Sequence, residues 1–245
     1  MGVTSPLERF RRAVRRGFVF DFDGTLSEIV AHPEIAQVVP GAPELLARLA
    51  ETNPLVVVVS GRPADQVREL IGVSNVTVVG LYGLSEAGSG GALDVARADI
   101  EGAARMVPGS WVEDKGPSLA VHYRGSADAV DAERILIPAL RRVAAANGLS
   151  VLPGKMVLEL VAGPVPGKGA VVEGLAGEAG VDGCLFAGDD LADVDAFAAL
   201  DGLERAGVAT VKVAVRSEET PASILDAADV VVDRPAGLVR LLSEL

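Results

Sequence analysis

The chain has 245 residues, 49% of them hydrophobic, which is enough for a packed core and makes intrinsic disorder the less favoured interpretation. Its net charge of −12 argues against nucleic acid or an anionic membrane surface as a partner, because both require a broad basic face. No apolar stretch reaches the ~18 residues that span a bilayer and the N-terminal segment lacks a signal-peptide layout, so we expect a cytoplasmic protein. The sequence leaves the oligomeric state open, and we favour a monomer.

Both ends of the chain alternate buried strands with helices. In the first part, apolar runs predict strands over 18–22, 55–60 and 76–80, and helical spacing predicts helices over 42–52 and 64–72. Near the other end we predict helices over 168–180 and 192–200, with strands at 184–188, 211–215 and 229–233. Continuous apolar strands joined by helices favour a Rossmann-like α/β fold with a parallel sheet covered on both faces.

The middle of the chain follows a different pattern. We interpret the glycine-rich stretch 85–94, SEAGSGGALD, as a hairpin or linker. The strands predicted over 118–124 and 155–161 alternate apolar and polar residues, which indicates a sheet with one face on a core and one face free. Together with an amphipathic helix over 128–148, this predicts a smaller α+β domain, residues 85–163, inserted into an α/β core of residues 1–84 and 164–245.

Polar residues follow three of the predicted core strands. Asp21 and Asp23 come after the first strand, residues 60–62 (Ser-Gly-Arg) after the second, and Asp189 and Asp190 after the strand 184–188. Each of these residues, taken alone, has an ordinary explanation as a turn residue or helix cap. Because the carboxyl ends of parallel strands meet at one edge of a sheet, their recurrence favours a ligand site there.

The carboxylates predict a cation at this edge. At the two-residue period of a strand, Asp21 and Asp23 project to the same side, and Asp189 adds a third carboxylate. Crowded carboxylates repel one another unless a cation neutralises them. With only two histidines in the chain and a single cysteine, Cys184, that we expect to be buried and inert, the ligands favour Mg²⁺ over zinc.

A lysine and a threonine are candidates for binding the phosphate that usually accompanies such a Mg²⁺ ion. The segment 162–170, AGPVPGKGA, is not a Walker A loop, because Ala162 and Gly169 occupy positions that require Gly and Ser or Thr. Lys168 still precedes a predicted helix, whose N-terminus attracts anions. Thr25, after the turn-forming Gly24, offers a hydroxyl and a backbone N–H.

Four segments resemble, in order, the signature motifs of haloacid-dehalogenase-type (HAD) phosphatases: DFDGTL (21–26), VVVVSGR (56–62), GKGAVVEGL (167–175) and GDDLADVDAF (188–197). The position of the inserted domain between the second and third motifs resembles the C2 cap class. More narrowly, three further segments are similar to trehalose-6-phosphate phosphatases: GLYGLSE (80–86), WVEDKGPSLAVHYR (111–124) and GKMVLEL (154–160). The chain departs from that family at Ala192 and Val194, where Thr and Glu are common, and at Tyr82, where His is usual.

The resemblance implies a Mg²⁺-dependent hydrolysis of trehalose 6-phosphate. Asp21 would be the nucleophile that forms an aspartyl phosphate, and Asp23 the general acid and base. Mg²⁺ would lie on Asp21, the backbone carbonyl of Asp23 and Asp189, and either Asp190 or Asp193 would hold metal-bound water or complement a helix dipole. The phosphoryl oxygens would be bound by Thr25, Ser60, Gly61, Arg62 and Lys168.

In the inserted domain, the resemblance makes six residues candidates for sugar recognition: Glu113, Lys115, His122, Arg124, Lys155 and Glu159. The alternative is a solvated sheet face with surface ion pairs. A trehalose-phosphate synthase is a possible partner in the same pathway. Competing functions are a phosphatase for sucrose phosphate or mannosylglycerate phosphate, phosphotransfer to a sugar, and a regulatory subunit that binds a sugar phosphate without turnover. The Asp21 and Asp23 pair argues against the last.

Overall fold

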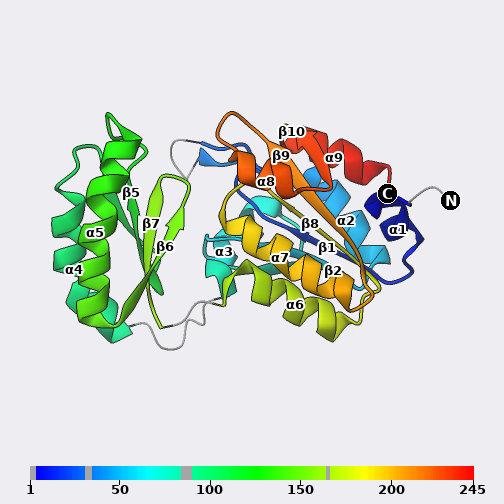
Figure 1. Cartoon of the computed structure of the whole chain (residues 1–245), viewed down its shortest axis with the longest axis horizontal. Coiled ribbons are helices and arrows are strands. Elements are labelled where there is room, and N and C mark those ends of the chain that lie inside the picture. Colours follow the sequence, from blue (N-terminus) through cyan, green and yellow to red (C-terminus); the bar gives the residue numbers. More distant parts are fainter. Residues whose placement is uncertain (1–3, 31–34, 84–89, 164–165) are drawn as a thin grey trace. The chain divides into compact units, whose positions relative to one another are not determined.

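A computed structural model describes residues 4–30, 35–83, 90–163 and 166–245. The chain divides into two compact units, a core unit of residues 1–83 and 166–245 and a cap unit of residues 84–165 (Figure 1). The core unit carries a parallel sheet and the cap unit an antiparallel one, so the predicted fold class is confirmed. Across the described ranges, no helix is both long and apolar enough to cross a membrane.

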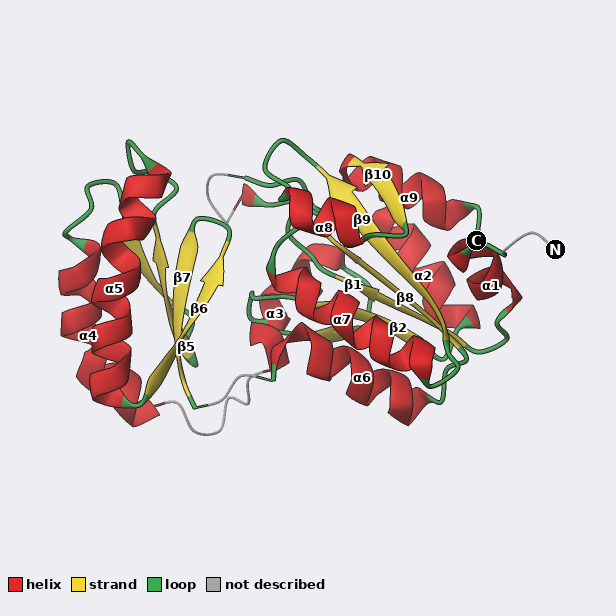
Figure 2. Ribbon diagram, in the orientation of Figure 1, coloured by secondary structure: helices red, strands yellow, loops and turns green. Residues whose placement is uncertain are grey.

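The described part of the core unit contains a six-stranded parallel sheet in the order β10-β9-β8-β1-β2-β3 (Figure 2). Its strands are β1 (Arg16–Phe20), β2 (Leu55–Val59), β3 (Thr77–Val79), β8 (Gly183–Gly188), β9 (Ala209–Arg216) and β10 (Val230–Asp233). In the middle of the sheet, Phe20 pairs with Val58 on one side and Ala187 on the other. The carboxyl ends of β1, β2 and β8 therefore lie at nearly the same level.

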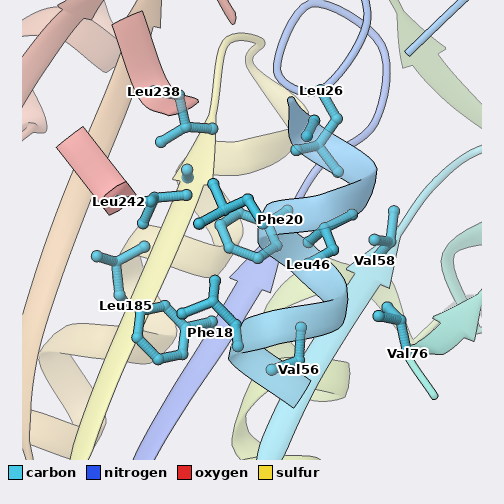
Figure 3. Close-up of a cluster of buried hydrophobic side chains, with 14 of the residues drawn as sticks. Phe18, Phe20, Leu26, Leu46, Val56, Val58, Val76, Leu185, Leu238 and Leu242 are labelled. Atoms are coloured by element: carbon cyan, nitrogen blue, oxygen red, sulfur yellow. The ribbon is translucent and has the colours of Figure 1, made fainter. Parts of the chain in front are cut away.

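Helices pack on both faces of this sheet. One face is covered by α1 (Pro6–Arg12), α2 (Ala42–Thr52), α3 (Ala64–Ile71) and α9 (Arg234–Ser243). There Phe18 and Phe20 pack against Leu46 and Leu242, and Figure 3 shows these side chains meeting above the strands. The other face is covered by α6 (Gly167–Ala179), α7 (Ala192–Arg205) and α8 (Ala222–Ala227). The sequences of these strands are continuous apolar runs because both faces of the sheet are buried.

The cap unit pairs four described strands in the antiparallel order β4-β5-β7-β6. These are β4 (Trp111–Asp114), β5 (Ser118–His122), β6 (Leu149–Gly154) and β7 (Val157–Ala162). Two helices, α4 (Gly90–Ala104) and α5 (Ala129–Asn147), share a buried cluster with one face of this sheet. Leu119, Val121, Leu158 and Leu160 belong to that cluster, as the alternation in the sequence predicts.

Two expectations for this region are wrong. The stretch 85–94 is not a hairpin or linker throughout, because residues 90–94 belong to α4, while 85–89 lie outside the described residues. Part of the glycine-rich sequence forms a helix, and the buried face of this helix begins at Leu93. The second face of the cap sheet is also not free, because Ala120 is fully buried and Glu159 is 3% exposed. Contacts within the sheet cover part of that face and are described below.

Candidate active site

Three strand ends of the core sheet carry the predicted site residues. Asp21 follows β1, and its backbone N–H donates to the Ala187 carbonyl of β8 at 2.9 Å, so the sheet pairing continues up to the carboxylate. Ser60 follows β2 and is held in the same way by Val79 of β3, also at 2.9 Å. Asp189 follows β8 directly. Because β1 lies between β2 and β8, these residues gather at one edge of the sheet, where α/β folds bind ligands.

Lys168 joins this edge from the first turn of α6. Its ammonium donates to Asp21 Oδ1 at 2.6 Å and to Asp193 Oδ1 at 2.5 Å, and only 3% of the lysine is exposed. Burial by itself would lower the pKa of Lys168. The carboxylates of Asp193 and Asp21 outweigh burial and raise that pKa well above its ordinary value, so the side chain stays positively charged.

Asp21, Asp189 and Asp193 form a buried carboxylate cluster within the described chain, with ligand oxygens within 4.8 Å of one another. Burial raises the pKa of Asp21 well above its usual range, Lys168 opposes that shift, and Asp193 and Asp189 add to it. Lys168 supplies a single positive charge next to these carboxylates, so the cluster keeps an excess of negative charge. Clustered carboxylate oxygens suit a hard divalent cation such as Mg²⁺, and the residues present fit such an ion.

Gly24 is required for this crowding. Its backbone has φ = +84°, and a Cβ built on it would overlap the carboxylate of Asp189. Any other residue would therefore be strained and would also displace Asp189. Gly24, which the sequence predicts as a turn residue, thus leaves room for the carboxylate of Asp189.

Asp193 has a larger part in the cluster than the sequence indicated. Its Oδ2 accepts the backbone N–H groups of Asp189 and Asp190, each at 2.9 Å, while Oδ1 accepts from Lys168. Asp190, which the resemblance makes a candidate for holding metal-bound water, accepts the backbone N–H of Leu191 at 2.6 Å and is half-buried outside the cluster. The available signal was the closeness of Asp193 to Asp189 and Asp190 in the sequence, at the start of the helix α7.

Asp23 lies apart from the cluster and is paired with Arg62. The guanidinium of Arg62 donates to both oxygens of Asp23, at 2.7 and 2.8 Å, and 42% of the Asp23 side chain is exposed. The backbone N–H of Arg62 donates to Ser60 Oγ at 3.1 Å, so residues 60–62 form a tight turn after β2. Thr25 Oγ1 is buried without a hydrogen-bond partner among the described residues.

The cap unit gathers polar residues on the sheet face opposite its helices. Glu113, Ala120 and Glu159 stand in one row across β4, β5 and β7, with the small alanine in the middle. Glu159 accepts a hydrogen bond from Ser118 Oγ at 2.5 Å, and its Oε1 lies 3.4 Å from the ammonium of Lys115. These contacts keep Glu159 buried and held in place.

The remaining cap candidates lie toward one end of the same strands. His122 Nε2 is 2.8 Å from Glu113 Oε2, and the His122 ring stacks on Trp111 with centroids 4.2 Å apart. Arg124 and Lys155 are half-buried, and the chain segments that carry them are joined by a hydrogen bond from the Tyr123 N–H to the Met156 carbonyl. The fold thus collects the predicted sugar-recognition residues within one part of the cap unit.

Comparison with known proteins finds a family model and several similar proteins. The family model described as trehalose-phosphatase matches residues 19–229. The chain is 34% identical over 243 residues to the trehalose-phosphate phosphatase of Mycobacterium leprae, covering 89% of this chain and 54% of that protein. It is 38% identical over 218 residues to an uncharacterized glycosyl hydrolase of Mycobacterium tuberculosis, with coverages of 81% and 16%.

Two further matches concern domain arrangement and fold. A bifunctional trehalose-6-phosphate synthase/phosphatase of Thermoproteus tenax is 35% identical over 202 residues, covering 77% of this chain and 28% of that protein. Among solved structures, the C-terminal domain of Candida albicans trehalose-6-phosphate phosphatase superposes with a TM-score of 0.81 at 23% identity, covering 98% and 94% of the two chains. The chain spans 54% of the length of the Mycobacterium leprae relative and smaller shares of the other two.

The crowded carboxylates predict how the protein responds to pH and to divalent cations. The folded-state pKa of Asp21 is raised, so its ionisation destabilises the metal-free fold as pH rises through that pKa. In EDTA, we expect Asp21→Asn to raise the melting temperature by about 3–6 °C at pH 8 and by less at pH 4. The same substitution should reduce the stabilisation that Mg²⁺ gives the wild type. Thermal unfolding followed by circular dichroism measures both effects.

Asp94→Asn is the matched control, because the side chain of Asp94 is 73% exposed and lies outside the cluster. It should leave the melting temperature and the effect of Mg²⁺ unchanged. If Asp21→Asn lowered the metal-free melting temperature at pH 8, or kept the full stabilisation by Mg²⁺, the account of this cluster would be wrong.

Proposed function

The chain belongs to the trehalose-phosphatase family, and on that premise we propose that it hydrolyses trehalose 6-phosphate to trehalose and phosphate through an aspartyl-phosphate intermediate, with Mg²⁺ as cofactor. The observation that carries the proposal is the buried grouping of Asp21, Asp189 and Lys168 at the carboxyl edge of the core sheet. A buried charge cluster of this kind costs desolvation free energy, which a purely structural role does not explain.

In the first step, a carboxylate oxygen of Asp21 attacks phosphorus and the bond from phosphorus to the sugar oxygen breaks. Lys168 binds Oδ1 of Asp21, which orients the carboxylate. Asp23 donates a proton to the departing sugar oxygen. In the second step, Asp23 takes a proton from the water that hydrolyses the aspartyl phosphate. The carboxylate of Asp23 is partly exposed and held by two hydrogen bonds from the Arg62 guanidinium. This suits a general acid and base that must reach the leaving oxygen and then water.

The phosphoryl oxygens need donors that are already in place before the reaction. The turn at residues 60–62 and the ammonium of Lys168 supply them, and we assign the same role to Thr25, whose buried hydroxyl has no partner among the described residues. A bound Mg²⁺ would supply positive charge next to the transferring group. Asp21, the backbone carbonyl of Asp23 and Asp189 would hold it, with Asp190 and Asp193 supporting its water ligands.

For the sugar, we propose that the cap unit binds its hydroxyl groups through six residues: Glu113, Lys115, His122, Arg124, Lys155 and Glu159. Buried carboxylates and ammonium groups held by neighbours recognise hydroxyls with little loss of side-chain freedom. Glu159 fits this role best, because Ser118 and Lys115 fix it in a row with Glu113. Fusion of synthase and phosphatase in the Thermoproteus tenax relative supports a trehalose-phosphate synthase as a partner.

The first prediction of this proposal is a substrate preference. With Mg²⁺, the purified protein should release phosphate from trehalose 6-phosphate in preference to sucrose 6-phosphate, glucose 6-phosphate and mannosyl-3-phosphoglycerate. EDTA should abolish release, and Asp21→Asn should lower kcat by about 10³-fold or more. Asp23→Asn should lose turnover but keep substrate binding. A malachite-green phosphate assay and calorimetry measure these quantities.

Asp94→Asn serves again as the active control. Preference for a different phosphate ester would leave the assignment of the core unit intact and overturn that of the cap. Binding of trehalose 6-phosphate without any release of phosphate would instead indicate a regulatory subunit. Normal turnover by Asp23→Asn would contradict the acid and base assignment.

A second prediction separates sugar recognition from the chemical step. Glu159→Gln should lower kcat/KM for trehalose 6-phosphate by about 10- to 100-fold, because a charged hydrogen-bond acceptor is lost. Hydrolysis of p-nitrophenyl phosphate, which carries no sugar, should change less than twofold. The exposed Glu133 provides the control substitution Glu133→Gln, which should affect neither substrate. Equal loss on both substrates would show that Glu159 supports the fold and does not recognise the sugar.

A further inference from the structure

Tyr82 has a strained backbone that the packing of the core does not explain. It lies in a short 3₁₀ turn, η2 (Leu81–Gly83), directly after β3, and its φ is +54°. Bulky side chains seldom adopt this left-handed region, because Cβ approaches the following carbonyl oxygen. Leu81 has the same conformation, but it is 3% exposed and its side chain is buried. Tyr82 is half-exposed and belongs to none of the buried hydrophobic clusters formed by the described residues.

The turn that follows β2 holds Tyr82 in this conformation. The backbone N–H of Tyr82 donates to the carbonyl of Ser60, and that of Leu81 donates to the carbonyl of Arg62, both at 3.0 Å. Two hydrogen bonds, from the adjacent residues Leu81 and Tyr82, therefore hold the strained segment to the turn that we assign to phosphoryl binding. Backbone strain that the surroundings enforce in this way is concentrated at functional sites.

The tyrosine ring lies close to both groups of proposed phosphoryl donors. A Cβ built on Gly61 would be 2.5 Å from the phenol oxygen of Tyr82 and 2.7 Å from Cζ, so the ring occupies the space that glycine leaves open. The ring centroid is also 5.8 Å from Nζ of Lys168. An aromatic face at this distance attracts an ammonium group. The hydroxyl end of the ring thus lies against Gly61, and the ring lies near the ammonium of Lys168.

We propose that Tyr82 is a substrate-contacting residue of this centre: its phenol hydroxyl donates a hydrogen bond to a phosphoryl oxygen held between the turn at residues 60–62 and Lys168. The ring also covers the ammonium of Lys168 and limits the access of water to it. The strained backbone is the cost of aiming this hydroxyl at the phosphoryl group. The proposal rests on the proposed function, because it takes the phosphate ester to be bound at this edge of the sheet.

The substitution Tyr82→Phe tests the hydroxyl, because it keeps the ring and the backbone conformation. We expect it to weaken the binding of inorganic phosphate in the presence of Mg²⁺ by about 10-fold, and to lower kcat/KM for trehalose 6-phosphate by about 10- to 100-fold. Its melting temperature should equal that of the wild type. Tyr123→Phe, at the chain's other tyrosine in the buried cap cluster, should leave phosphate binding unchanged. Wild-type affinity and turnover in Tyr82→Phe would overturn the proposal.

The substitution Tyr82→Gly separates function from structural support. Glycine adopts a positive φ without strain, so the melting temperature should stay the same or rise while phosphate binding falls at least as far as in Tyr82→Phe. A lower melting temperature together with unchanged phosphate affinity would show that the ring is only a packing element, and would overturn the proposal.

Measuring the binding of inorganic phosphate distinguishes a failure of the Tyr82 proposal from a failure of the proposed function. If the wild type binds inorganic phosphate but hydrolyses no ester, the proposed function fails, and the affinities of the Tyr82 variants still decide the role of the hydroxyl. If the wild type binds no phosphate in the presence of Mg²⁺, the proposal for Tyr82 fails, while phosphate release from the ester still decides the proposed function. Isothermal titration calorimetry with inorganic phosphate measures these affinities directly.

Discussion

The rest of the centre depends on the two ion pairs that the buried ammonium of Lys168 makes with Asp21 and Asp193. It joins the end of β1 to the first turns of α6 and α7, and 147 residues separate Lys168 from Asp21. Removing these charges from water is costly, and the cluster still keeps more negative than positive charge. A cation and the negative phosphoryl group can each complement part of this arrangement. A divalent cation would offset this excess of negative charge.

Parallel pairing of the sheet explains why such a centre can be built precisely. Because Phe20 is in register with Val58 and Ala187, the residues that follow these strands are placed by backbone hydrogen bonds before their side chains interact. The cap unit has its own buried cluster and its own sheet, and its polar residues lie on the face away from that cluster. Residues that would recognise the sugar are therefore separate from those that would transfer the phosphoryl group.

Much of this arrangement was predictable from the sequence. The meeting of Asp21, Ser60 and Asp189 follows from one rule, that parallel strands end at the same edge. The sequence also predicts Lys168 at a helix N-terminus, and the structure has it in the first turn of α6. The partners of these groups were not predictable. That Asp193 shares Lys168 with Asp21 depends on how α7 packs beside α6, and a local pattern does not contain that information. The left-handed backbone of Tyr82 is likewise imposed by a turn some twenty residues earlier in the chain.

A crystal structure of the protein with Mg²⁺ and orthovanadate would test the central claim most directly, because vanadate imitates the phosphoryl group during transfer. We expect vanadium next to a carboxylate oxygen of Asp21, the ion bound by Asp21 and Asp189, and the ammonium of Lys168 within hydrogen-bond distance of the vanadate oxygens. Vanadate bound elsewhere, or an ion that makes no contact with Asp21, would contradict it.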